Sequence, residues 1–181
     1  MADLARALRL FDDYAERSAL AGVLANDSGI AVALAELLTP ADFYDERRQV
    51  LFEAAVNVLR GADPMTPAAI LAEARHVKTE RKLAVALDEE YINSIGGEVA
   101  EAVQFGTVVK KWAWARQFAG LSERFLVRLQ QNPDITEFYA WAMGELQALA
   151  PKTHNGGIVY GWETVGLHRA VIDERRTQND D

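Results

Sequence analysis

The sequence of 181 residues contains no cysteine and only three histidines, which do not match the usual spacing of metal ligands. Disulfides and thiolate chemistry are therefore excluded, and nothing indicates a structural metal. No apolar run approaches the roughly 18 residues that a helix needs to span a bilayer. The first residues, Met1 to Leu4, also lack the basic start and apolar stretch of a signal peptide. We therefore expect a cytoplasmic protein with no membrane contact.

Sequence motifs for catalysis are missing as well. The chain has no G-x-x-x-x-G-K-[ST] phosphate loop, no G-x-S-x-G and no His-x-x-x-His. Two pairs of adjacent acids, Asp12-Asp13 and Glu89-Glu90, are candidates for acid–base chemistry, but neighbours on a helix point about 100° apart and usually mark a solvated face. The sequence thus predicts a chain that is not an enzyme and binds no cofactor.

What the sequence does contain is typical of helices. Ala, Leu, Glu and Arg dominate, and period-two alternation of β-branched residues is almost absent. Thr66-Pro67 is a favourable helix start, and Asn132-Pro133-Asp134 separates the two longest helical stretches. The sequence predicts an all-α protein with helices at about residues 3–25, 30–38, 45–60, 67–75, 79–88, 90–95, 100–131 and 135–149.

The stretch after residue 104 predicts a long antiparallel helical hairpin that follows a compact multi-helix globular part. Its first helix has two apolar stripes about 110° apart, more than one partner helix can cover. One stripe contains Phe105, Val108, Trp112, Ala115, Ala119, Leu126 and Leu129. The spare stripe is typical of a dimer interface. The predicted oligomer interface consists of Trp114, Phe118, Leu121 and Phe125 on the first helix and Tyr139, Met143 and Leu146 on the second.

The formal net charge of −8 argues against strong DNA binding by the whole surface, because affinity for nucleic acid comes largely from neutralised phosphates. Residues 105–131, however, carry five basic residues against one acid, a balance of +4 that leaves −12 for the rest. A packed aromatic face with a solvated basic edge is the favoured explanation. Weak contact with single-stranded DNA, beside Trp112 and Trp114, remains the alternative for Lys110, Lys111, Arg124 and Arg128.

The segment from Leu37 to Ala55 is the most informative part of the chain. It predicts a helix end, a proline-containing turn, an aromatic pair and a second helix with a capping acid at Asp45. The pair Phe43-Tyr44 suits packing at the turn better than stacking on a ligand. The segment resembles the L-x-P-x-D-F-Y signature of the N-terminal domain of DnaB-type replicative helicases. The following helix resembles the family's H-x-x-I-F-x-A-I, with Arg48 in place of the histidine.

Three further segments resemble the family in the same order. Residues 19–27 are similar to its first helix, V-L-G-x-L-L, with a glycine in the middle. Residues 59–66 match L-x-x-x-G-x-P-I-D, and residues 108–116 match I-V-x-x-K-x-L-x-R. Together the resemblance covers about residues 10–150. Its departures suggest a divergent branch of the family, such as one from a phage or plasmid.

The composition changes after Pro151. Residues 152–157 have the composition of a flexible linker, and the amphipathic stretch that follows includes Trp162, Val165 and Ile172. This stretch resembles the linker helix that joins the family's N-terminal domain to its RecA-like ATPase domain. We therefore divide the sequence into a globular helical part, a dimerising hairpin and a linker with its helix, at residues 1–104, 105–150 and 151–181.

The resemblance implies a non-catalytic collar domain. Its copies would form dimers, three dimers would form a hexameric ring, and the ring would dock primase and helicase loader and help to admit single-stranded DNA. ATP and Mg²⁺ would bind only to an ATPase domain outside this chain, which in the parent protein drives 5′–3′ DNA unwinding. The alternative is a stand-alone adaptor that binds a cellular replicative helicase and regulates its loading during DNA replication.

Overall fold

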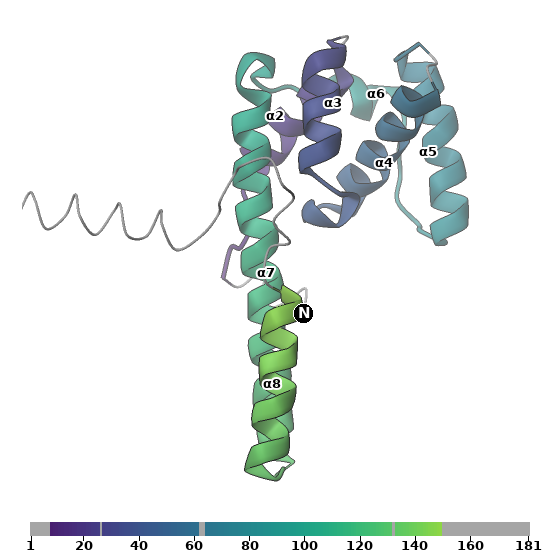
Figure 1. Ribbon diagram of the computed structural model, residues 1–181. Coiled ribbons are helices and arrows are strands. Elements are labelled where there is room, and N and C mark those ends of the chain that lie inside the picture. The colour runs from purple at the N-terminus through teal and green to yellow at the C-terminus, as the bar shows by residue number, and fades with distance from the viewer. Residues whose placement is uncertain (1–7, 26, 62–63, 132, 150–181) are drawn as a thin grey trace, which may run out of the picture. The chain divides into compact units, whose positions relative to one another are not determined.

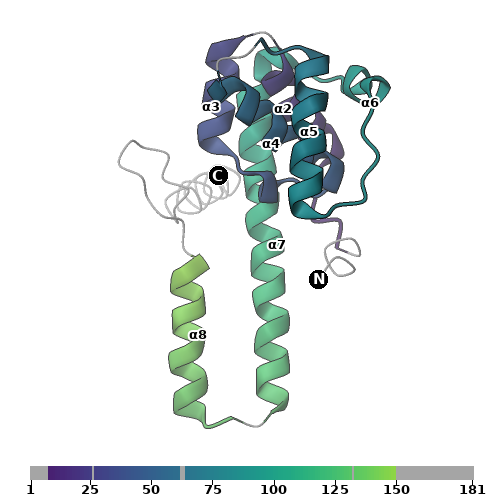
Figure 2. The same cartoon turned by 90° about the vertical axis from the view of Figure 1, so that its right-hand side faces the viewer.

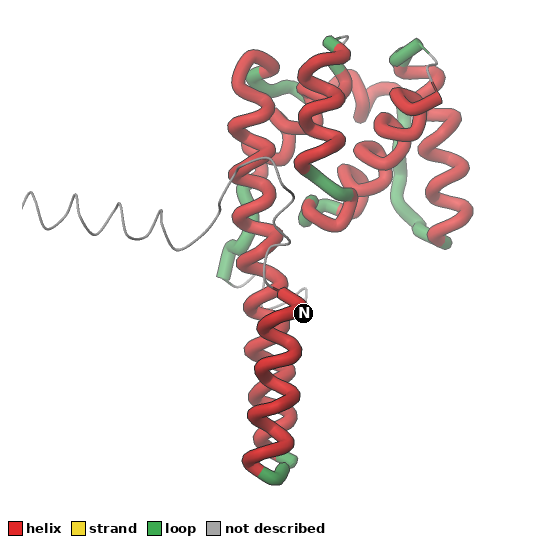
Figure 3. Tube along the Cα trace, viewed as in Figure 1, coloured by secondary structure: helices red, strands yellow, loops and turns green. Residues whose placement is uncertain are grey.

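The computed structural model describes residues 8–25, 27–61, 64–131 and 133–149. Every regular element in these ranges is a helix, and none is a strand (Figure 3). The elements labelled in Figure 1, with two short 3-10 helices η1 and η2, are α2 (Asp13–Leu24), α3 (Ser28–Leu37), η1 (Pro40–Asp42), α4 (Glu46–Gly61), α5 (Pro67–Arg81), α6 (Glu89–Ser94), η2 (Val99–Glu101), α7 (Ala102–Gln130) and α8 (Ile135–Leu149). The predicted all-α class is confirmed.

The chain divides into two compact units, residues 1–127 and 128–181. The first unit contains α2 to α6 and most of α7, and the second contains the last turn of α7 and α8. In the first unit, α7 runs beside α2 and α3 (Figure 2). The division predicted from the sequence, at residues 104/105 and 150/151, stays a prediction.

Side-chain caps determine where most of the helices begin. An oxygen of the capping side chain accepts hydrogen bonds of 2.7–3.2 Å from backbone N–H groups of the first helical turn. Each such cap typically stabilises a helix by about 1 kcal/mol. The capping residues are Asp12, Asp27, Thr66, Asp88 and Asp134. The helix starts predicted at Thr66-Pro67 and after Asp134 are therefore confirmed.

Three of the predicted helices are wrong in extent. Of the helix predicted at residues 3–25, residues 3–7 lie outside the described residues and residues 8–12 are not helical, so α2 begins at Asp13, after the extended capping residue Asp12. The break predicted between residues 75 and 79 does not exist, and α5 is continuous to Arg81. It ends at Lys82, whose φ of 54° is left-handed and incompatible with another helical turn.

The residues after Lys82 are not helical, although a helix was predicted to residue 88. Leu83, Val85 and Leu87 are half-buried against the core, whereas Ala84 and Ala86 between them are exposed. This period of two is characteristic of extended backbone. The apolar residues of the segment are therefore buried by an extended connection that leads to α6.

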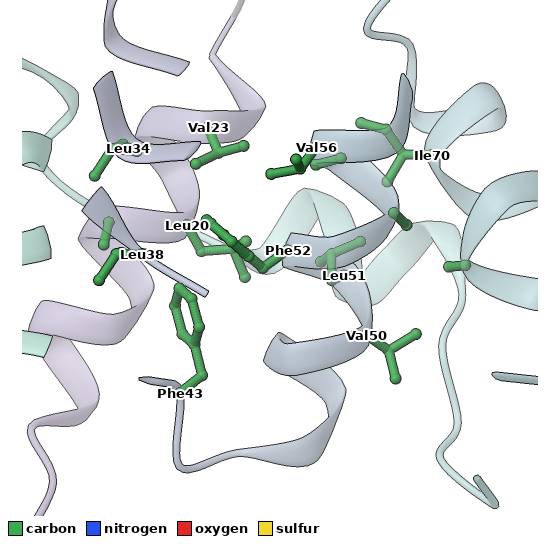
Figure 4. Packing of buried hydrophobic residues seen from close by; sticks show 14 of the residues in the cluster. Leu20, Val23, Leu34, Leu38, Phe43, Val50, Leu51, Phe52, Val56 and Ile70 are labelled. Atoms are coloured by element: carbon green, nitrogen blue, oxygen red, sulfur yellow. The ribbon is translucent and has the colours of Figure 1, made fainter. Parts of the chain in front are cut away.

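The core of the first unit forms where the apolar faces of α2, α3, α4 and α5 meet (Figure 4). Phe52 of α4 lies near its centre, with its ring centroid 5.0 Å from that of Phe43. Leu20 and Leu34 approach from one side and Ile70 from the other. All five are nearly inaccessible to solvent. Truncating a buried phenylalanine to alanine typically costs 3–5 kcal/mol, so this cluster is a main source of stability.

The second unit contains a reversal of the chain. The guanidinium of Arg128, in the last turn of α7, lies 4.7 Å from the centroid of the Trp141 ring in α8. A continuous helix would hold residues at this separation about 20 Å apart. The chain therefore turns back between the two helices, as the Asn132-Pro133-Asp134 break predicts.

Gly22 marks a close approach between helices of the first unit. A Cβ atom at this position would clash with the Cβ of Ala102 at the start of α7 and would lie 2.9 Å from Leu34 Cδ1. The Cβ of Ala102 can move only with its backbone, and Leu34 is fully buried in the core, so neither neighbour has free space to move into. The absence of a side chain at Gly22 is thus what lets α2 approach both α3 and α7.

We expect Gly22→Ala to lower the free energy of unfolding by roughly 1–2 kcal/mol, because the overpacking cost exceeds the gain in helix propensity. Gly144→Ala in α8 is the matched control, since a Cβ there meets nothing within 4 Å. It should leave stability unchanged or raise it by up to about 1 kcal/mol. Urea unfolding followed by circular dichroism measures both. A Gly22→Ala variant as stable as the wild type would contradict the close approach.

Candidate interaction surface

The turn between α3 and α4 is held by the carboxylate of Asp42. Its Oδ2 accepts hydrogen bonds from the backbone N–H of Thr39 at 2.7 Å and from the Thr39 hydroxyl at 2.9 Å. Pro40 supplies the fixed φ that suits the first position of η1. The Asp42 carboxylate is buried. The Thr-Pro-x-Asp spacing is thus explained by the hydrogen bonds of the turn itself.

A second buried carboxylate, that of Glu16 in α2, joins this turn to the start of α4. Glu16 is 1% exposed, and its Oε1 accepts a hydrogen bond from the backbone N–H of Tyr44 at 2.7 Å. Its Oε2 accepts from the N–H of Asp45 at 3.5 Å and from Nη1 of Arg48 at 2.9 Å. A carboxylate beside a helix N-terminus also interacts favourably with the helix dipole.

Arg48 supplies the counter-charge that Glu16 needs. Burial alone lowers the pKa of Arg48, but hydrogen bonds to Asp13 and Glu16 and their negative charges outweigh it, so the pKa lies above its ordinary value. Nη2 of Arg48 donates to Asp13, which lies at the surface. The pair with Glu16 is the buried one, and a buried charge without its partner is strongly destabilising.

Two cations of α7 attach this helix to the same turn. Lys110 donates from Nζ to Asp42 Oδ2 at 2.7 Å. Arg116 donates to the carbonyl oxygen of Leu10 at 2.9 Å and to the carbonyl oxygen of Asp42. Burial lowers the pKa of Arg116, although the negative charges of Glu16 and Asp42 oppose this change. The helix is therefore fixed to the turn by charged hydrogen bonds.

The pair Phe43-Tyr44 packs within the protein. Phe43 is buried against Phe52, and the Tyr44 ring stacks on Phe11 with centroids 4.5 Å apart and an angle of 8° between the planes. The guanidinium of Arg116 lies 5.8 Å from the Tyr44 ring centroid. These contacts account for both aromatic residues through packing, as favoured from the sequence.

Apolar side chains stay exposed along α7 in the first unit. Trp114 is 48% exposed and Phe118 is 45% exposed, and their rings stack at a centroid distance of 5.6 Å. Leu126 lies further along the same helix and is exposed as well. We call Trp114 and Phe118 the α7 surface. Its aromatic residues are of the kind that is enriched at protein interfaces.

In the second unit, α8 exposes the three residues predicted for an interface, Tyr139, Met143 and Leu146, which we call the α8 surface. Two other predicted interface residues differ from these. Leu121 is 1% exposed, and Phe125 is half-buried and engaged in a contact. Of the predicted α7 stripe, Trp114 and Phe118 are therefore exposed, whereas Leu121 is buried within the protein.

The four α7 cations that were considered for nucleic-acid contact are not equally available. Lys110 is bonded to Asp42, and Arg128 lies over the ring of Trp141. Lys111 is exposed, with its Nζ 5.9 Å from the ring centroid of Trp112, and Arg124 is exposed but also takes part in an interaction. Half of the predicted basic edge therefore has a structural role, and contact with DNA there stays a prediction.

The predicted linker-helix residues Trp162, Val165 and Ile172 lie outside the described residues. Across the described ranges, no group of three or more His, Cys, Asp and Glu residues is arranged to hold a metal ion. In the same ranges, no helix has the length and apolar character that a membrane span requires.

The first unit, which we call the head, is an all-helical domain with a buried ion pair and exposed apolar side chains on α7. The chain belongs to the family of the DnaB-like helicase N terminal domain, whose sequence model matches residues 10–111. The fold is shared with the crystal structure of the N-terminal domain of DnaB helicase from Mycobacterium tuberculosis, at a TM-score of 0.65 and 20% identity over 75% of this chain and 96% of that one. No curated protein matches the sequence. The resemblance found from the sequence is confirmed.

Glu16 and Arg116 were not singled out from the sequence, although a signal for Glu16 exists. Glu16 shares a helical face with Leu20 and Val23, at spacings of four and seven. Arg48 likewise shares a face with Phe52 of α4. An acid and a base that both stand on apolar faces predict a buried ion pair between two helices.

We expect Arg48→Met to lower the free energy of unfolding by roughly 3–5 kcal/mol, because it leaves the Glu16 carboxylate buried without its counter-charge. Arg47→Met is the matched control. The Arg47 side chain is 45% exposed in its ion pair with Asp45, so its loss should cost at most about 1 kcal/mol. Urea unfolding of the two variants distinguishes these values. Equal losses would show that the buried pair has no special role.

Proposed function

We propose that this chain is the non-catalytic collar domain of a hexameric replicative DNA helicase, where it mediates oligomerisation and docks primase and helicase loader. The observation that carries the proposal is the presence of exposed apolar surfaces on α7 and α8 in a member of the DnaB-like N-terminal domain family. ATP and Mg²⁺ belong, in this proposal, to an ATPase domain outside the chain.

The chemistry of the α7 and α8 surfaces supports a protein partner. Trp114 and Phe118 form a stacked, half-exposed pair, and Tyr139 and Met143 are exposed on α8. Aromatic residues and methionine are enriched at protein interfaces, and rigid aromatic anchors contribute much of their binding energy. Burying these side chains in water-excluded contact would stabilise a complex by the hydrophobic effect.

The distribution of charge supports a second copy of the chain as that partner. Residues 132–149 contain three acids, Asp134, Glu137 and Glu145, and no lysine or arginine, whereas residues 105–131 carry a balance of +4. Opposite charges on two helices favour contact between them, here between two copies of the chain. A dimer formed through these helices brings apolar and complementary charged groups together.

The fixed position of α7 on the head supports the same role. Lys110 and Arg116 tie α7 to the turn at Asp42, and Gly106 lets Leu34 of α3 approach it closely. An interface built on a rigidly held helix loses less conformational entropy on association than one built on a mobile segment. Docking of primase and helicase loader on the assembled collar follows from the family and has no residue assigned to it.

We expect the chain to self-associate, and Phe118→Glu to weaken the association constant at least tenfold, because burying one large aromatic side chain contributes a few kcal/mol at most and a buried charge opposes it. Sedimentation equilibrium measures the effect. Val32→Glu is the matched control, since Val32 is an exposed apolar residue of α3 outside both surfaces. A wild-type chain that stays monomeric at high concentration would refute the proposal.

A further inference from the structure

The second half of α5 is a basic segment on an acidic protein. Residues 75–82 contain Arg75, Lys78, Arg81 and Lys82 and one acid, Glu80. The balance of +3 in this segment leaves −11 for the rest of the chain. Such a local excess creates a positive potential that the overall charge of −8 conceals.

Three of these cations have no partner among the described residues. Arg81 forms an ion pair with Glu53 at 3.0 Å, and Glu80 lies 3.3 Å from His76. The side chains of Arg75, Lys78 and Lys82, by contrast, make no ion pair or hydrogen bond within the described chain. We call Arg75, Lys78 and Lys82 the α5 cationic face.

Two of these side chains share one side of α5, and the third follows at its end. Arg75 and Lys78 are three residues apart and so lie about 60° apart around the helix, and Lys82, the left-handed C-cap, comes directly after the last helical residue, about 10 Å from Arg75 along the helix axis. The helix dipole favours cations in the last turn, a small effect that does not extend to Arg75, which lies further from the helix end. Stabilisation of the helix end therefore does not explain why all three positions of the α5 cationic face are basic.

The surroundings of the α5 cationic face indicate what it binds. In the described residues between Val32 and Val103, no large hydrophobic side chain is exposed. A protein partner or a membrane surface requires apolar anchors, which are missing here. Contacts to phosphate groups require only cations, because their affinity comes from charge neutralisation and counterion release.

We infer that Arg75, Lys78 and Lys82 bind consecutive phosphates of a nucleic-acid backbone. This site is distinct from the basic edge on α7, where Lys110 and Arg128 are engaged within the protein. The inference does not depend on self-association through α7 and α8, because the α5 cationic face lies outside both surfaces. The contact carries no base readout, since no exposed aromatic ring accompanies the cations.

The experiment measures binding of a fluorescein-labelled oligothymidylate to the full chain by anisotropy, at salt concentrations from 50 to 200 mM. When three phosphates are neutralised, the logarithm of the association constant falls with the logarithm of the salt concentration with a slope of about −2. The affinity of the wild type should therefore fall roughly 20-fold over this range. The triple variant Arg75→Gln/Lys78→Gln/Lys82→Gln should lose most of its binding and most of this slope. Circular dichroism should show an unchanged fold, since the three side chains form no ion pair or hydrogen bond with another described residue.

The matched control is Arg9→Gln/Arg60→Gln/Lys111→Gln, which changes the net charge equally at exposed positions and includes one cation of the α7 edge. Binding by this control should stay within about twofold of the wild type. Equal losses in both variants would overturn the inference, as would undetectable wild-type binding at 50 mM salt. Competition by polyglutamate as effective as that of unlabelled oligothymidylate would also overturn it, because the face would then select acidic chains in general.

Discussion

The fold of the head depends on the carboxylate of Glu16, which is buried where α2 meets the turn before α4 and the first turn of α4. A lone buried carboxylate is strongly unfavourable, so its position is defined by the groups that compensate it. These are Arg48 of α4 and the backbone N–H groups of Tyr44 and Asp45. Since the compensation requires all of them at once, α2 fixes both the turn before α4 and the direction in which α4 starts.

The remaining arrangement follows from that turn. Phe43 enters the core against Phe52 only when the turn has this shape, and Asp42 at its other end binds Lys110 of α7. The orientation of α7 is therefore coupled to the same ionic network that starts α4. Because Arg116 also donates to the carbonyl oxygen of Asp42, α7 is held at two points, one and a half turns apart.

The sequence predicts the elements better than the contacts between them. Caps and breaks are local signals, so Thr66-Pro67 and Asp134 could be found without any tertiary information. The segment from Leu83 to Leu87 was predicted wrongly because its residues are good helix formers, and their period-two burial against the core outweighs that propensity. The burial of Leu121 could not be predicted, because the sequence shows two apolar stripes on this helix but not which of them is covered by the rest of the protein.

The sequence also does not reveal which charged side chains are paired within the fold, and those that are unpaired are the ones that can bind a polyanion. A count of lysines and arginines along α7 treats all of them as available, but Lys110 is committed to Asp42 and Arg128 to Trp141. The cations of α5 are less evident in such a count because an acid, Glu80, stands among them in the sequence. Only the contacts of the folded chain show that Glu53 compensates Arg81, that Glu80 lies beside His76, and that no described carboxylate pairs with the α5 cationic face. Which cations are available is thus a property of the fold: Lys110, Arg116 and Arg128 of α7 make contacts within the protein. The α5 cationic face, by contrast, has no ion pair with a described residue.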